Sequence, residues 1–282
     1  MIVLFVLLGG LGAWVFTLPA FDLGAVLASS PDPTKPGWVL LAVALVQVWS
    51  YPLHDPVMMD RGFIADRVTT RRSFDHAFWI SALCVLAFGV IGVFAGLNRI
   101  DGEALMDTLG RLLGTPALLA VNLALIVSAV STLDSALASA SKLAVVDMGL
   151  GEPTPANGRI AMAAFTAGGL ILLLTGSKDL FTAVAVSDTA ALFLAPVVFF
   201  CIWGGLRVPG WSYAAAFVLA MAGSVVYFLE SAGHAQPITT LLGPLHDYTK
   251  LLIVNAAVLA GGMLALAAGA LVRPRTAAGA GA

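Results

Sequence analysis

The sequence predicts an all-α polytopic membrane protein with about eight transmembrane helices. Of its 282 residues, 60% are hydrophobic and only 11% are charged, whereas soluble domains carry about 25% charged residues. Apolar stretches of about 20 residues, enough to cross roughly 30 Å of hydrocarbon, recur along the chain. The loops between them are too short for a water-soluble domain, so we expect one transmembrane domain over residues 1–272.

The predicted spans follow from the apolar stretches and have approximate ends. They cover residues 2–20, 37–58, 76–97, 117–142, 160–177, 181–204, 211–229 and 251–272. The first is interpreted as a span because it lacks the basic start and the cleavage site of a signal peptide. Helical spacing of leucines in 99–114 predicts an amphipathic helix over the outer mouth. The small-residue tail 273–282 is expected to be flexible and cytoplasmic.

The basic residues predict the orientation. With both termini in the cytoplasm, nine lysines and arginines lie on that side and five on the other. We therefore expect an integral protein of the plasma (inner) membrane with both termini cytoplasmic. The net charge of -2 argues against a nucleic-acid partner. Cys84 and Cys201 stand alone in apolar runs and offer no disulfide framework.

A polar stripe interrupts the fourth span. Residues three and four apart share a helix face, and here they are Ser128, Ser131, Thr132, Ser135, Ser139 and Lys142. One interpretation is helix packing, with hydroxyls bonded to neighbours or to the preceding turn. Asp134 favours a second interpretation, in which the stripe faces a water-filled path with a bound cation. An intramembrane carboxylate costs at least about 2.5 kcal/mol and usually faces a partner or an aqueous cavity. Hydroxyl and carbonyl oxygens are ligands of hard cations.

The segment SAVSTLDSALASASKLAVVD (128–147) resembles the S-A-x-x-S-T-x-D-S segment of the sodium/solute symporter family, relatives of the sodium–proline and sodium–glucose transporters. In that family it lies on the eighth helix of a leucine-transporter-type core, where two hydroxyls and a backbone carbonyl one turn earlier bind sodium. The resemblance implies that Ser131 and Thr132 supply the hydroxyls and Ser128 the carbonyl. Asp134 and Ser135 would then line the ion path or support it structurally.

Two further segments support the resemblance. Residues 54–78 are similar to the stretch after the sixth core helix, with Pro56, Asp60 and Arg61 in the matching places, although the family more often has Gln-Arg. Residues 192–211 are similar to the tenth core helix and the turn beyond it. The first span then matches the fifth core helix. This implies a leucine-transporter-type inverted-repeat fold that lacks its first four core helices.

The second span carries the expected substrate cavity. Pro52 and Pro56 predict a kink or an unwound stretch, and broken helices line substrate sites in transporters. The resemblance also places the cavity on this helix, with Val48, Trp49 and Pro52 as wall residues. An aromatic belt at the membrane interface is the alternative for the aromatic residues. Asn122 either reaches the cavity or bonds a neighbouring helix.

Asp188, in AVSDTAALF, is another acid within a predicted span. We interpret it as a helix N-cap after a break, with Ser187 and Thr189 assisting. A position on the ion path, in the outer vestibule, is the alternative.

The function predicted from the resemblance is sodium-coupled symport of a small organic solute by alternating access. It implies no enzyme activity and no cofactor apart from sodium as coupling ion; the partners are the solute, sodium and the lipid bilayer. Because the missing first helix supplies further sodium ligands in the family, three cases stay open: a fragment, a second polypeptide that supplies the amino-terminal helices, or loss of transport.

Two other function classes stay open. Absence of the first four core helices favours a non-transporting sensory or scaffold membrane domain of the same fold. An intramembrane metal-dependent enzyme would use His54, Asp55 and Asp60, but no familiar catalytic spacing accompanies these residues.

Overall fold

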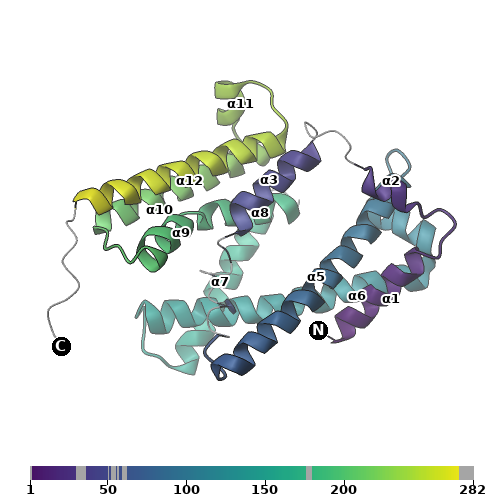
Figure 1. Cartoon of the computed structure of the whole chain (residues 1–282), viewed down its shortest axis with the longest axis horizontal. Coiled ribbons are helices and arrows are strands. Elements are labelled where there is room, and N and C mark those ends of the chain that lie inside the picture. Colours follow the sequence, from purple (N-terminus) through teal and green to yellow (C-terminus); the bar gives the residue numbers. More distant parts are fainter. Residues whose placement is uncertain are drawn as a thin grey trace. The chain divides into compact units, whose positions relative to one another are not determined.

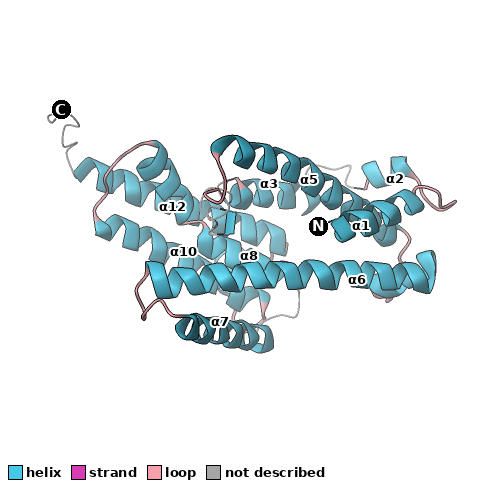
Figure 2. Cartoon of the chain, turned by 90° about the horizontal axis from the view of Figure 1, so that it is seen from below, coloured by secondary structure: helices cyan, strands magenta, loops and turns pink. Residues whose placement is uncertain are grey.

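The computed structural model describes residues 2–29, 36–49, 51, 55, 57–58, 62–175 and 180–272, and these form helices joined by loops, without strands (Figure 2). The chain divides into two compact units. Unit 1 comprises Met1–Pro31 and Asp60–Met162, and unit 2 comprises Asp32–Met59 and Ala163–Ala282. The boundary between Met162 and Ala163 falls within the helix α7 (Pro155–Thr175), which Figure 1 labels.

Six helical segments within the described residues are long and apolar enough to cross a membrane. They are Arg67–Leu97, Leu105–Asp147, Pro155–Leu174, Phe181–Trp203, Gly210–Ser231 and Asp247–Val272. The prediction of an all-α polytopic membrane protein is thereby confirmed. The first two predicted spans correspond to shorter helices, α1 (Ile2–Val15) and α3 (Pro36–Val48). At 1.5 Å per residue α1 is about 21 Å long, less than the hydrocarbon thickness, so the count of eight stays a prediction.

Unit 1 contains α1, α2 (Leu23–Leu27), α5 (Arg67–Leu97) and α6 (Leu105–Lys142), which a π-helical turn continues to Asp147. The helix α1 packs against both α5 and α6. Their apolar faces form one core, because residues three and four apart on each helix point the same way. The buried members are Leu11, Val15, Ile91, Phe94, Ala95, Leu109, Leu113, Ala117 and Val121.

The helix α5 begins earlier than predicted. The predicted third span begins at residue 76, but the helix begins at Arg67, after the N-cap Asp66. The Asp66 carboxylate accepts hydrogen bonds from the backbone N–H groups of Val68 (3.0 Å) and Thr69 (3.1 Å), which satisfies two amides of the first turn. Hydrogen bonds from Thr69, and then from Val68, hold the Asp66 pKa below its ordinary value.

The amphipathic helix predicted within 99–114 is part of α6. It begins at Leu105, and Leu109 and Leu113 are buried in the core of unit 1. A kink separates it from the fourth predicted span, because Gly114 has a φ of 78° and Pro116 follows two residues later. Positive φ favours glycine, and proline is tolerated only where a new helical turn starts.

A bidentate ion pair fixes the start of α6. The Arg111 guanidinium donates to both carboxylate oxygens of Glu103, at 3.0 and 2.9 Å, and to the carbonyl of Asn98 at 2.8 Å. The Thr108 hydroxyl donates to the same carboxylate at 2.9 Å. The hydrogen bond from Arg111 lowers the pKa of Glu103 to about 2, from an ordinary value of 4.5.

This ion pair predicts a specific dependence of stability on pH. The folded-state pKa of Glu103 is depressed, so its contribution is present above about pH 4.5 and disappears as the pH falls toward 2. We expect the melting temperature of wild type to exceed that of Glu103→Gln above pH 5, and the difference to shrink between pH 4.5 and 2. Thermal unfolding in detergent measures it; a difference that does not change over this range would contradict the prediction.

Unit 2 contains α3, α8 (Leu180–Ala191), the short α9 (Leu194–Val197) with a π-helical continuation to Trp203, α10 (Gly210–Ser231), α11 (Pro237–Leu242) and α12 (Asp247–Val272). The helices α10 and α12 lie side by side, and α3 packs on α12 (Figure 1). The predicted sixth span is interrupted between α8 and α9. Pro196 cannot donate an amide to the Leu192 carbonyl, which instead accepts from Ala195 at 3.1 Å in a tighter turn.

Small residues let α10 and α12 approach closely, as in other membrane helix pairs. Ser212, Ala216 and Ala220 are buried on α10, one turn apart. On α12, a Cβ added to Gly262 would lie 3.8 Å from the Ala216 Cβ of α10 and 3.0 Å from Pro196 of α9. One added to Gly269 would lie 2.7 Å from the Ser212 Cβ and 3.0 Å from Pro209. The backbone of α12 therefore takes the space of a side chain at these positions.

We expect Gly269→Leu to lower the free energy of unfolding by about 1–3 kcal/mol, because overpacking forces the helices apart. Ala268→Leu is the matched control, since Ala268 is exposed on the same turn. Melting temperatures in detergent compare the two. Equal effects of both substitutions would show that the contact with Ser212 does not limit the packing.

Candidate functional site

The polar stripe lies in unit 1, in the second half of α6. The Thr132 hydroxyl donates to the Ser128 carbonyl at 2.9 Å, and the Ser135 hydroxyl donates to the Ser131 carbonyl at 3.1 Å. Three residues of this segment are exposed: Ser131, Thr132 and Asp134. Ser128 and Ser135 are half-buried. Hydroxyl–carbonyl pairs one turn apart thus line an exposed face of the helix.

The pair formed by the Ser128 carbonyl and the Thr132 hydroxyl has the spacing of adjacent ligands around a hard cation. Oxygens about 2.4 Å from an ion and about 80° apart lie about 3 Å from each other. The same bond is also the ordinary back-bond of a threonine within a helix. With the Ser131 hydroxyl, α6 offers three oxygens, whereas a hard cation takes about six. Further ligands would have to come from elsewhere.

Asp134 and Asn122 lie on α6 as well. No described residue forms a hydrogen bond or ion pair with the Asp134 carboxylate. The Asn122 amide donates to the Leu118 carbonyl of its own helix at 2.9 Å. Asn122 belongs to unit 1, whereas the other predicted cavity residues, Val48 and Trp49, belong to unit 2.

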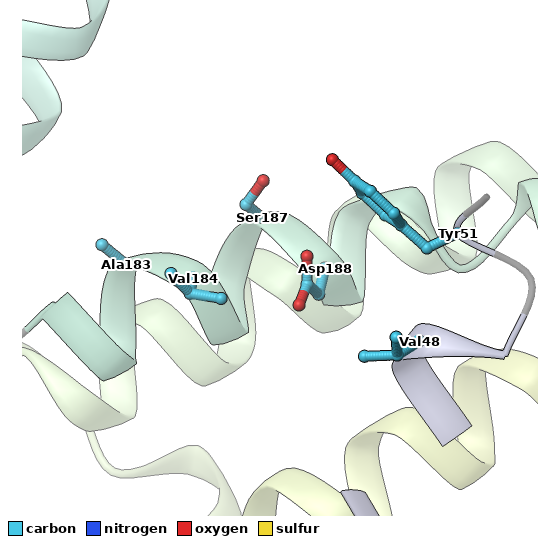
Figure 3. A pocket seen from close by; sticks show the side chains of 6 residues that line it. All are labelled: Val48, Tyr51, Ala183, Val184, Ser187 and Asp188. Carbon is cyan, nitrogen blue, oxygen red and sulfur yellow. The ribbon is translucent and has the colours of Figure 1, made fainter. Parts of the chain in front are cut away.

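A pocket of about 540 Å³ opens in unit 2 (Figure 3). Its lining residues come from α8 and from the chain at the end of α3. They are Val48, Tyr51, Ala183, Val184, Ser187 and Asp188. Val48, which the sequence predicts as a wall residue of the substrate cavity, therefore lines this pocket. Trp49 lies next to it in sequence, with its ring 6.4 Å from that of Trp203; Pro52 falls outside the described residues.

Asp188 is not an N-cap, so that interpretation is wrong. The helix α8 begins at Leu180 and continues to Ala191, which places Asp188 in its interior. The actual break follows α8 and comes from Pro196, not from the S-D-T triplet. Sequence analysis missed Tyr51, Ala183 and Val184. Helical spacing predicts Ala183 and Val184 on the face of Asp188, because residues 183, 184, 187 and 188 share one side of a helix.

A buried polar cluster holds α8 in place behind the pocket. Gln47 of α3 donates from Nε2 to the Ala185 carbonyl (3.3 Å) and to the Thr189 hydroxyl (3.4 Å). The Thr189 hydroxyl lies 2.7 Å from that carbonyl and 2.8 Å from the side-chain oxygen of Asn255 on α12. Thr189 and Asn255 are fully buried. The cluster joins three helices of unit 2 next to Asp188.

The residues considered for a metal enzyme are only partly described. His54 and Asp60 fall outside the described residues, and the Asp55 carboxylate accepts a hydrogen bond from the Met58 amide at 3.2 Å. Within the part of the chain that the structure covers, no group of three or more His, Cys, Asp or Glu side chains is placed to hold a metal ion.

Comparisons with known proteins add no relative: no family model matches the chain, and neither a curated protein nor a solved structure gives a significant match. The fold and composition nevertheless define a class. The chain is an integral membrane protein whose described residues form helices without strands, and six of these helices have the length and apolarity of membrane spans.

Proposed function

We propose that the chain is the carboxy-terminal part of a sodium-coupled symporter for a small organic solute. The observation that carries the proposal is the set of oxygens on α6: the Ser128 carbonyl and the Thr132 hydroxyl 2.9 Å apart, with Ser131 beside them on an exposed face. Lipid offers no hydrogen-bond partners, so such a face on a membrane helix favours an aqueous cleft with a cation.

A sodium site needs more oxygens than α6 supplies, and this shapes the proposal. The remaining ligands would come from water or from a second polypeptide that carries the amino-terminal helices of the transporter core. Sodium binding would stabilise one state of the transporter and raise its affinity for the solute, as differential binding requires. A membrane potential contributes about 2.3 kcal/mol per charge per 100 mV to uptake. We place the protein in the plasma (inner) membrane with cytoplasmic termini, from its basic residues.

The test is solute uptake in the native host, where any partner polypeptide is present. Cells that carry the wild-type chain or a variant take up labelled amines, amino acids, sugars and carboxylates in sodium or potassium medium. We expect uptake of at least one class to require sodium. Ser131→Ala and Thr132→Ala should each raise the half-saturating sodium concentration about tenfold, which corresponds to about 1.4 kcal/mol for a lost ligand.

The control is Ser141→Ala on the same helix. Ser141 is buried and its hydroxyl donates to the Ala138 carbonyl at 2.9 Å, away from the proposed ligands. It should leave the sodium dependence unchanged. Identical sodium dependence in wild type, Ser131→Ala and Thr132→Ala would eliminate the ion site, and equal uptake in sodium and potassium would eliminate the coupling.

A further inference from the structure

The carboxylate of Asp188 is one of the groups that line the pocket of unit 2. It lies in the interior of α8, half-buried, and no described residue donates a hydrogen bond to it or forms an ion pair with it. Figure 3 shows its side chain between α8 and the end of α3, with Val48 and Tyr51 beside it. A carboxylate within a membrane segment normally faces a counter-charge or a ligand path. The structure therefore leaves a place for a cation in this pocket.

The other pocket residues fit an organic cation better than a bare ion. Val48, Ala183 and Val184 present apolar side chains, whereas Ser187 supplies one hydroxyl. Tyr51 adds an aromatic ring, whose face attracts ammonium groups. A bare ion requires several converging oxygens, but an ammonium group on a carbon skeleton needs one counter-ion and apolar contact. The volume of about 540 Å³ suits a small molecule.

A second carboxylate strengthens the negative potential near the pocket. The Tyr51 hydroxyl donates a hydrogen bond to the Asp55 carboxylate, and the charges of Asp55 and Asp188 both act on Tyr51. Among the described residues that line the pocket, none is basic. Like charges gathered at a concave, partly apolar surface raise the local concentration of ligands of opposite charge.

We propose that this pocket binds the ammonium group of a small organic amine, with Asp188 as its counter-ion. Tyr51 covers the cation with its ring, Ser187 offers a hydrogen bond, and Val48, Ala183 and Val184 contact the carbon skeleton. The inference rests on the proposed function, because it names the substrate class of the same transporter. Neutral and purely anionic solutes of equal size would bind poorly, since they leave the carboxylate without a counter-charge.

The test uses the purified full chain in a non-ionic detergent and a potassium buffer. The probes are butylammonium, butanol and butyrate, which share a carbon skeleton and differ in charge. We expect butylammonium alone to raise the melting temperature of wild type. Asp188→Asn should abolish the rise. Asp247→Asn, which removes an exposed carboxylate of the same unit outside the pocket, should keep it.

A second variant covers the case in which Asp188→Asn does not fold. Ala183→Phe fills the pocket but leaves the carboxylate in place, and it should also abolish the rise. Equal shifts with butanol, or a butylammonium shift that persists in either variant, would overturn the proposal. The proposal would also be overturned if butylammonium did not raise the melting temperature while wild-type stability depended on pH and Asp188→Asn removed that dependence. Asp188 would then be a proton site. The melting measurements contain no sodium. Failure of the sodium-coupling proposal in the uptake assay would therefore not change the result expected for butylammonium binding.

Discussion

Lys250→Met is expected to lower the free energy of unfolding by about 3 kcal/mol, because it leaves a buried carboxylate without its cation. Lys250 on α12 lies 3.0 Å from Glu230 at the end of α10, and only 3% of the Glu230 side chain is exposed. Glu230 also accepts hydrogen bonds from the Ile238 amide at 2.9 Å and from the Thr239 side chain. Glu230 therefore connects α10 to α12 through Lys250 and to α11 through Ile238 and Thr239.

A double-mutant cycle separates the charge from the packing. Glu230→Gln combined with Lys250→Met removes both charges and keeps similar shapes, so the double variant should be more stable than Lys250→Met alone. Asp247→Asn serves as the control, because that carboxylate is 69% exposed and lies 3.4 Å from Lys250; its effect should fall within about 1 kcal/mol. Urea or thermal unfolding in detergent measures wild type, Lys250→Met, Glu230→Gln, the double variant and the Asp247→Asn control. If the effects of the two substitutions simply add, Glu230 does not depend on Lys250.

Thr189→Val should lower the free energy of unfolding by about 1–3 kcal/mol, since it removes the hydroxyl shared by the buried cluster of unit 2. Gln47 and Asn255 would each lose a partner, and neither can reach water, because Asn255 is fully buried and Gln47 is 8% exposed. The α8 helix would lose a polar contact with α12 at the residue that follows Asp188.

Asn255→Leu, in contrast, should leave the free energy of unfolding nearly unchanged or raise it. The Asn255 amide nitrogen has no hydrogen-bond partner among the described residues. Turning the amide over would place its nitrogen beside Thr189 and leave its oxygen unpaired, so one polar atom lacks a partner in either orientation. Leucine removes that atom, while Thr189 keeps its bond to the Ala185 carbonyl. A cost for Asn255→Leu as large as that for Thr189→Val would show that both atoms of the amide are satisfied.

Helix positions were predictable where the signal is local. The spans 211–229 and 251–272 correspond closely to α10 and α12, because continuous apolar sequence between polar ends marks a membrane helix. The early start of α5 was also readable in principle, since Asp66 followed by a helical pattern is a capping signal. The predicted span begins only at residue 76, because the charges of Arg67, Arg71 and Arg72 do not fit an apolar membrane segment.

The two candidate sites differ in how far the sequence predicts them. The hydroxyl stripe follows from helical spacing alone, and its back-bonds to Ser128 and Ser131 appear where spacing places them. Asp188 could not be placed in this way. Its role depends on where α8 begins and on the approach of Val48 and Tyr51, which are far away in the sequence.

The sequence by itself determined that this is an all-helical membrane protein with a hydroxyl-rich face on one span, because composition and helical periodicity need no knowledge of neighbours. Only the tertiary structure decided that Asp188 lines a pocket and that Gln47, Thr189 and Asn255 meet. Gln47 and Thr189 are 142 residues apart, and Thr189 and Asn255 are 66 apart. Such contacts arise from the packing of whole helices, which depends on the shapes of the faces that meet and not on any short motif.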